Sequence, residues 1–237
     1  MKPERGNILF LILLAVVLFA ALSYAVTQST NGGGKNASGE SNRAKAASIL
    51  QFFDQLDAAV LRMRMTGGIP LQNISFEYMY KNYGGSPFMT FVNANCTNDA
   101  CRVFKPDGGG ATPRTFEQYA VANPTSWNVA WAYPGYMEFE MGQWPYAGTD
   151  LNDIIVQILL VQAAVCDEIN NALGITGSMG WTGAQVGQNT PANWDNAAWV
   201  ISASNPQQLM SRNTFAGAYF GTGADARCAV YHMVAAR

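Results

Sequence analysis

The stretch ILFLILLAVVLFAALSYAV, residues 8–26, decides how the rest of the chain is interpreted. It contains no charged residue, no proline and no glycine. A helix rises about 1.5 Å per residue, so this run would span about 28 Å, close to the hydrocarbon core of a bilayer. Lys2 and Arg5 precede it, whereas only Lys35 follows soon after it. The asymmetry favours a single-pass inner (cytoplasmic) membrane protein whose N-terminus is in the cytoplasm and whose C-terminal domain is periplasmic or extracellular.

Three interpretations of this segment remain open from the residues alone. It could be a permanent membrane anchor. It could be a secretory signal, whose apolar region of about 7–15 residues precedes a small-residue cleavage site, and residues 23–25 (Ser-Tyr-Ala) could serve as that site. It could also be a prepilin-type leader, in which cleavage follows a glycine that directly precedes the apolar run. Gly6 ends the short basic leader MKPERG and stands where that glycine would stand.

With Gly6 behind a basic leader and an apolar run directly after it, the chain resembles type IV pilin-like proteins, including pseudopilins. The resemblance covers the leader, the apolar helix and, loosely, a second helical stretch followed by a cysteine-containing domain. It implies cleavage between Gly6 and Asn7 by a prepilin peptidase, with other pilin-like subunits as partners. The chain departs from the family pattern where Leu11 replaces a common glutamate at the fifth mature position, and where glycines at 32–34 interrupt the helix. The missing glutamate points to a minor subunit.

Composition limits the function further. Charged residues make up 13% of the 237, about half the usual share, and aromatic residues make up 12%, which suits an extracellular surface of strands and loops. The net charge of −2 gives no basic footprint, so no nucleic-acid partner is expected. The expected organisation is a leader at 1–6, a transmembrane helix at 7–26, a Gly-rich linker at 27–41 and an extracytoplasmic domain at 42–237.

Four cysteines behind an export signal predict two disulfides. Three pairings are possible, and the turn-like tetrapeptide between Cys96 and Cys101 favours a bond between these two. Cys166 and Cys228 would then join the middle of a helix to the last strand. A metal site is not expected, because the chain has no C-x-x-C motif and His232 is its single histidine.

The domain is predicted to be α+β, with an antiparallel sheet packed against one or two helices. Apolar residues at three- and four-residue steps predict a helix at 42–65, capped by Ser41 and ended by Gly67 and Gly68. A second helix is expected from residue 149 or 150 to 173, with Gly174 as its stop. Period-two alternation around Pro134 and Gly135 predicts a hairpin. The other expected strands are 76–80, 88–92, 198–203, 215–220 and 228–234, and the predicted hairpin strands are 127–133 and 136–141.

Catalytic chemistry is not expected, and neither is a cofactor. His232 lies within an apolar terminal strand without a second histidine, which favours a structural role. Glu138 and Glu140 are spaced like one solvated strand face rather than an acid–base pair. The glycine run at 108–110 lacks the Lys-Ser/Thr and helix of a phosphate loop. Asp and Asn at 150–153 are explained by helix capping.

The aromatic residues leave one further candidate site. Six tryptophans exceed what a small sheet needs for its core, and Trp144, Trp181 and Trp194 lie in loop-like sequence where they could contact a ligand or partner. The leading hypothesis is therefore a non-enzymatic, pilin-like subunit of a surface filament or secretion pseudopilus, held in the lipid bilayer by its N-terminal helix. The alternative is a membrane-tethered binding or adhesion module that does not polymerise.

Overall fold

The computed structural model describes residues 37–83, 86–89, 92–121, 135–142, 153–175, 213–220 and 227–235. The chain divides into two compact units, residues 1–42 and 43–237, and the contacts discussed below belong to the second. The predicted leader, transmembrane helix and strands at 127–133 and 198–203 lie outside the described residues. Among the described residues, none of the helices combines the length and the hydropathy that crossing a membrane requires.

The first described element is a helix at residues 37–65, called the long helix below. It begins earlier than predicted: residues 37–41 are helical rather than linker, so Ser41 lies inside the helix instead of capping it. Nothing in Ala-Ser-Gly-Glu-Ser opposes helix as a proline would, so the small, polar composition was a poor boundary signal. The predicted end is confirmed, because Thr66 N–H donates to Arg62 O (2.9 Å) and Gly68 takes a φ of 62°.

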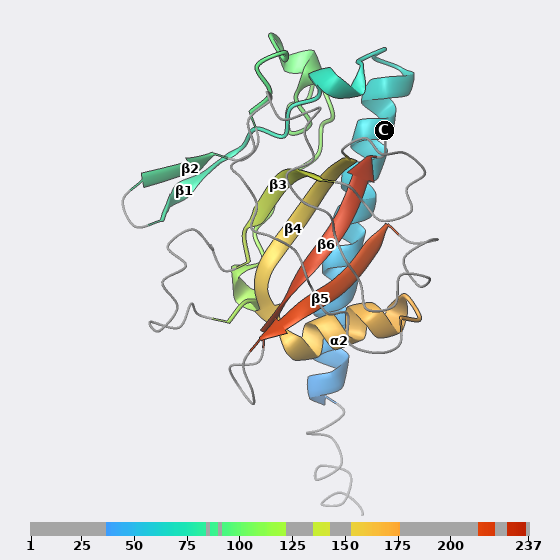
Figure 1. Cartoon of the computed structure of the whole chain (residues 1–237), viewed down its shortest axis with the longest axis vertical. Helices are drawn as coiled ribbons and strands as arrows, with labels where there is room; N and C mark the ends of the chain where they lie inside the picture. The colour runs from blue at the N-terminus through green and yellow to red at the C-terminus, as the bar shows by residue number, and fades with distance from the viewer. Residues whose placement is uncertain are drawn as a thin grey trace, which may run out of the picture. The chain divides into compact units, whose positions relative to one another are not determined.

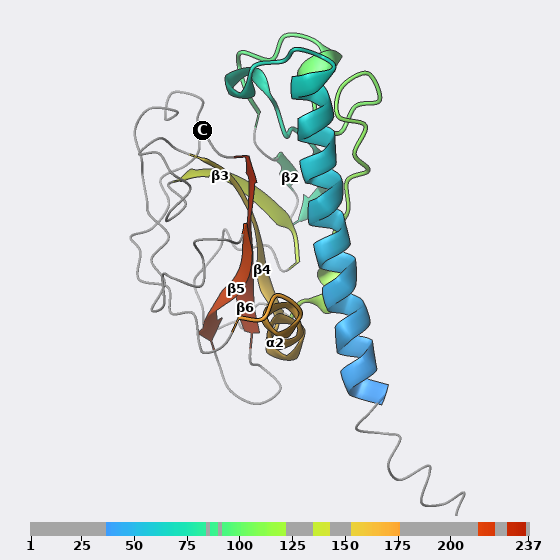
Figure 2. The same ribbon diagram turned by 90° about the vertical axis from the view of Figure 1, so that its right-hand side faces the viewer.

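One face of a four-stranded antiparallel sheet, in the order β3-β4-β6-β5, packs against the long helix (Figures 1 and 2). Its strands are β3 (Met137–Gly142), β4 (Asp153–Gln162), β5 (Thr214–Phe220) and β6 (Arg227–Ala235). The predicted strands at 136–141, 215–220 and 228–234 are thus confirmed to within one or two residues. Nearly every side chain of β4 and β6 is buried, as expected of central strands covered on both faces.

The predicted helix at 150–173 is wrong in its first half. Residues 153–162 form the central strand β4, and only α2 (Ala163–Ala172) is helical. The apolar spacing satisfied a helical period, but a continuous apolar run fits a buried strand equally well. The run is rich in β-branched residues, which pack well on a pleated surface: Ile154, Ile155, Val156, Ile158 and Val161. Gly174 ends α2 as predicted, with a φ of 64°.

Asn170 of α2 covers part of the edge strand β5. Its carboxamide Nδ2 donates to Ala216 O (2.9 Å), and its Oδ1 accepts from Ala216 N–H (2.9 Å). The side chain therefore pairs with the backbone as a neighbouring strand would. Exposed strand edges are templates for unwanted pairing, so this contact closes one position of the edge and fixes α2 against the sheet.

A bulge interrupts β4 near its C-terminal end. The pairing with β6 shifts between Ile158 and Val161, and Leu160 takes a left-handed φ of 59°. The bulge turns two carbonyl groups outward: Leu159 O accepts from Gly135 N–H (2.9 Å) and Leu160 O from Val121 N–H (2.8 Å). It thereby anchors Val121 and Gly135, which both precede β3 in the chain, to the sheet.

Shorter elements connect the long helix to the sheet. A hairpin of β1 (Met79–Tyr83) and β2 (Ser86–Met89) lies apart from the four-stranded sheet (Figure 1). The sequence predicted two strands here, at 76–80 and 88–92, and the observed strands lie closer together along the chain. Single 3-10 turns are η1 (Leu71–Asn73), η2 (Asp99–Cys101) and η3 (Glu117–Tyr119).

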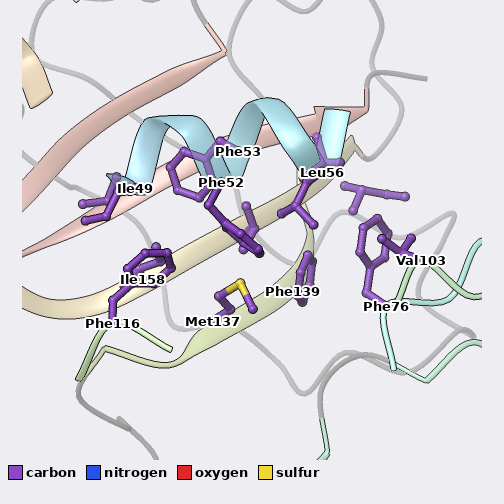
Figure 3. Packing of buried hydrophobic residues seen from close by; sticks show 14 of the residues in the cluster. Ile49, Phe52, Phe53, Leu56, Phe76, Val103, Phe116, Met137, Phe139 and Ile158 are labelled. Carbon is purple, nitrogen blue, oxygen red and sulfur yellow. The ribbon is translucent and has the colours of Figure 1, made fainter. Parts of the chain in front are cut away.

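The core is the layer between the long helix and the sheet (Figure 3). Phe52 is fully buried, and its ring meets the edge of Phe116 at a centroid distance of 5.6 Å. Phe76 stacks on Phe139 of β3 at 4.5 Å. Burying a side chain of this size stabilises a fold by about 1.5–3 kcal/mol. The apolar stripe of the helix that faces the sheet consists of Ala46, Ile49, Phe52, Phe53, Leu56, Ala59, Val60 and Met63.

Candidate functional site

Both predicted disulfides are present. Cys96 bonds Cys101 with a Cα–Cα distance of 5.5 Å, and Cys166 bonds Cys228 with a Cα–Cα distance of 6.6 Å. Both distances lie in the usual range for a disulfide. The second bond joins α2 to β6, as the sequence analysis expected. The two-disulfide arrangement is typical of a protein that folds in an oxidising compartment.

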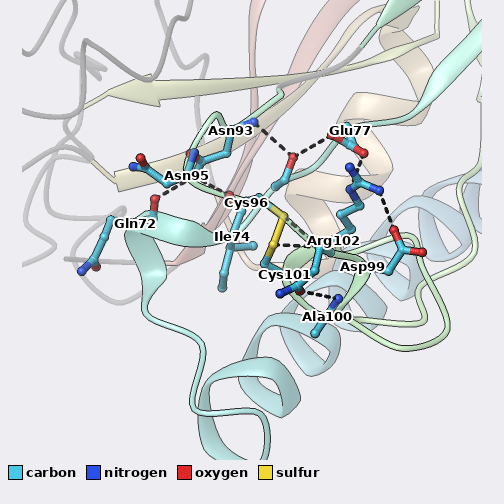
Figure 4. Close-up of a disulfide and its surroundings, with 12 residues drawn as sticks. Gln72, Ile74, Glu77, Asn93, Asn95, Cys96, Asp99, Ala100, Cys101 and Arg102 are labelled. Carbon is cyan, nitrogen blue, oxygen red and sulfur yellow. Dashed lines mark hydrogen bonds and ion pairs between the residues drawn. A yellow bond between two sulfur atoms is a disulfide. The ribbon is translucent and has the colours of Figure 1, made fainter.

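The first disulfide lies in an irregular region at the C-terminal end of the long helix. We call this region, residues 66–78 and 92–111, the loop lobe. Its organising side chain is Asn93, which is 1% exposed. Asn93 Nδ2 donates to Gln72 O (2.7 Å) and Ile74 O (3.0 Å), and its Oδ1 accepts from Asn95 N–H (2.9 Å) (Figure 4). One buried carboxamide thus ties two segments that are about twenty residues apart in sequence.

Ser75 extends this network towards the disulfide. It is fully buried, and its hydroxyl accepts a hydrogen bond from Asn93 N–H (3.1 Å). Its backbone forms an isolated parallel bridge with Arg102: Ser75 N–H donates to Cys101 O (2.8 Å), and Val103 N–H donates to Ser75 O (2.9 Å). The guanidinium of Arg102 lies between the carboxylates of Glu77 and Asp99 (Figure 4). Ile74, Phe76 and Val103 of the lobe are buried in the apolar core, and this polar network joins the loops of the lobe to one another.

Arg62 and the glycine run join the lobe to the long helix. Arg62 Nη2 donates to Gly108 O (2.8 Å) and to Gly109 O. A Cβ atom on Gly109 would collide with the backbone of Val103, so this approach requires glycine. The glycine run, which the sequence only excluded as a phosphate loop, thus presents two backbone carbonyl groups to a cation. Carbonyl groups that face an arginine are the opposite of a phosphate cradle, which presents N–H groups.

His232 sits in β6, as predicted, and takes part in a polar ring of which His232 and Thr214 are buried. It is 1% exposed and stacks on Phe53 of the long helix at a centroid distance of 4.5 Å. Its Nε2 lies 2.8 Å from Asp57 Oδ1, and its Nδ1 lies 2.7 Å from Thr214 Oγ1. Asn213 closes the ring, because its Nδ2 donates to Asp57 Oδ2 (3.1 Å) and its Oδ1 lies 3.3 Å from Thr214 Oγ1. A carboxylate can only accept, so Nε2 carries a hydrogen towards Asp57.

This Asp-His-Thr arrangement contains the residue types of a nucleophilic triad, but its geometry better fits a structural contact between the long helix and the sheet. Thr214 is 3% exposed, so a substrate could not reach its hydroxyl. The imidazole is enclosed by Phe53 on one face, and only Asp57 is partly exposed, at 34% of its side chain. What the ring can do is fasten the long helix to β5 and β6.

The remaining predicted site residues are only partly placed. Glu138 and Glu140 lie at alternate positions of β3, where their backbones face Gln157 and Ile155 of β4. Gly6 and Asn7 lie outside the described residues, and so do Trp144, Trp181 and Trp194. No group of residues in the described ranges could hold a metal ion.

The solvent face of the long helix carries two large apolar side chains near its end. Leu61 is 60% exposed and Met65 is 79% exposed, and they are one helical turn apart. The sequence analysis did not single them out. Nor did it find Asp57, Thr214 or Asn93, because no local pattern marks a residue whose partner is far away in the chain.

Comparison of the chain with models of protein families, with curated proteins and with solved structures finds no match.

Proposed function

We propose that this chain is a pilin-like, non-enzymatic subunit of a surface filament or secretion pseudopilus, and that it is a minor component. Its N-terminal helix, residues 7–26, holds it in the inner membrane before assembly. After assembly the folded domain of residues 42–237, called the head below, faces outward. No cofactor is part of this proposal, and the partners are the lipid bilayer, a prepilin peptidase and other pilin-like subunits.

The observation that carries the proposal is Gly6 directly before an uninterrupted apolar run. The described head adds support. The helix at residues 37–65 packs on an antiparallel sheet, and two disulfides cross-link the head. Such a head is suited to an oxidising location outside the cytoplasm.

The mature N-terminus tests this proposal most directly. Mass spectrometry of the chain purified from its own membranes should give a first residue of Asn7. Gly6→Ala should leave the leader in place, whereas Gly32→Ala, a matched glycine substitution in the linker, should not affect cleavage. A wild-type chain that begins at Met1 or near Val26 would remove the prepilin interpretation.

Assembly needs a separate experiment. Shearing of cells followed by centrifugation should release the mature chain with other subunits in a pelleted filament fraction, and crosslinking before shearing should give ladders that contain it. A mature chain that stays monomeric in the membrane fraction would contradict a filament role.

That second outcome is what the alternative function predicts. The glycines at 32–34 favour a membrane-tethered binding or adhesion module, because a flexible hinge lets a head search its surroundings. In that case Trp144, Trp181 and Trp194 are the candidate contact residues. Their substitution by alanine should weaken binding to the cell surface or ligand without changing the amount of chain in the membrane.

A further inference from the structure

Three Asn-x-Ser/Thr sequences in which x is not proline occur in this chain, at Asn36, Asn73 and Asn95. This motif is the acceptor for N-linked glycans in exported proteins, and it is used on exposed surfaces. The sequence does not distinguish between the three. The structure does so for the two that lie wholly within its described residues, Asn73 and Asn95.

Asn95 presents its motif to solvent. Asn95 and Thr97 are both exposed, and Asn95 lies in a turn of the loop lobe. Within the described part of the chain, neither the Asn95 carboxamide nor the Thr97 hydroxyl has a hydrogen-bond partner. The Asn95 backbone N–H donates to Asn93 Oδ1 (2.9 Å), which fixes the turn and leaves the side chain free (Figure 4).

Asn73 belongs to a motif that the fold hides. Its third residue, Ser75, is fully buried, and the Ser75 hydroxyl is occupied by Asn93 N–H (3.1 Å). The Ser75 backbone is also bonded on both sides, to Cys101 O and Val103 N–H. A transferase that recognises the hydroxyl group two residues after the asparagine cannot reach it in the folded head.

We propose that Asn95 is an N-glycosylation site of the folded head and that Asn73 is not. Asn95 Nδ2 would form a bond to the anomeric carbon of a lipid-linked oligosaccharide. The bond from that carbon to the lipid phosphate oxygen breaks, the lipid phosphate leaves, and the amide nitrogen loses one proton to the transferase. The inference rests on the outward location of the head given under the proposed function.

Trypsin separates the three motifs, so one experiment examines all of them. Cleavage after Lys and Arg places Asn36 in peptide 36–43, Asn73 in 65–81 and Asn95 in 82–102. In the reduced, alkylated chain purified from its own cells, peptide 82–102 should carry a glycan, identified by sugar fragment ions, and peptide 65–81 should be unmodified. An unmodified 82–102, or a glycan on 65–81, would overturn the proposal.

Variants at Thr97 test whether transfer of the glycan requires the hydroxyl group of the Asn-x-Ser/Thr motif. Thr97→Ser keeps the hydroxyl and should keep the glycan, whereas Thr97→Ala should abolish it. Neither exchange removes a contact of the described fold. A glycan that persists in Thr97→Ala would contradict N-linked transfer.

Protease added to intact cells or spheroplasts provides the control for location. If the head is digested from outside while peptide 82–102 is unmodified, the proposed glycosylation of Asn95 is wrong but the outward location of the head is supported. If the head is protected until the membrane is opened from the cytoplasmic side, the location itself is wrong.

Discussion

The sheet side of the molecule, β3 to β6 and α2 against the long helix, differs from the loop lobe in what holds it together. The sheet side buries apolar side chains between a helix and regular strands. The lobe has little regular structure. It contributes Ile74, Phe76 and Val103 to the apolar core, but its loops are joined to one another by hydrogen bonds and ion pairs of Asn93, Ser75, Arg102 and Arg62. Apolar packing is spread over many contacts, whereas a polar network concentrates its effect in a few atoms. The two regions should therefore respond differently to substitution.

The largest effect is expected at the centre of the sheet side. Phe52→Ala removes a fully buried ring that packs on Phe116, and we expect the free energy of unfolding to fall by about 3–5 kcal/mol. Urea denaturation followed by circular dichroism measures this. Gln55→Ala, an exposed exchange one turn away, is the control and should change stability by less than about 0.5 kcal/mol. Equal losses in both variants would mean that the helix does not pack as described.

The disulfides compare the two regions directly. Cys166–Cys228 spans 62 residues and Cys96–Cys101 spans 5. From loop entropy in the unfolded chain, the first should contribute about 4 kcal/mol and the second about 2 kcal/mol. The double alanine variants of each pair, compared by denaturation under non-reducing conditions, should keep that order. The reverse order would show that the short bond restrains the lobe by more than chain entropy.

Asn93 tests whether the lobe depends on single polar groups. Asn93→Ala leaves Gln72 O and Ile74 O without their donor in a buried place, which should cost about 1–3 kcal/mol. Asn95→Ala, at an exposed position two residues on, should cost less than about 0.5 kcal/mol. Hydrogen exchange should then localise the loss from Asn93→Ala to residues 66–78 and 92–111. A loss spread evenly over β4 and β6 would contradict an independent lobe.

The same contrast explains how far the sequence could be interpreted. Strands β5 and β6, the end of the long helix and both disulfides were predictable, because apolar alternation, glycine and cysteine spacing are local signals. The β4 segment was misassigned because Ile154, Ile155 and Ile158 satisfy a helical period and a buried strand equally well. Only the neighbouring strands β3 and β6, which are distant in sequence, decide between the two.

The candidate site was less predictable than the fold. The glycines at 108–110 showed no phosphate-loop pattern, but the role of the Gly108 and Gly109 carbonyl groups as acceptors appears only once Arg62, 46 residues before Gly108, is brought beside them. Asp57 and His232 are 175 residues apart. A lone aspartate on the edge of a helical stripe has the same sequence signature as any solvated one, so its partner could not be inferred.

The smallest expected effect concerns the contact between Asp57 and His232, and Asp54 on the same helix offers a matched control. Asp57→Ala and Asp54→Ala are the same exchange on the same helix, so both gain the same helix propensity. Only Asp57 contacts His232 Nε2 (2.8 Å) and Asn213 Nδ2 (3.1 Å). A hydrogen bond to a charged group contributes about 1.5–3 kcal/mol, but Asp57 is one-third exposed and water can replace part of it, so we expect a difference of about 1 kcal/mol between the variants. Thermal unfolding of both variants measures that difference. If the two variants unfold at the same temperature, the ring does not fasten the helix, and apolar packing alone holds it on the sheet.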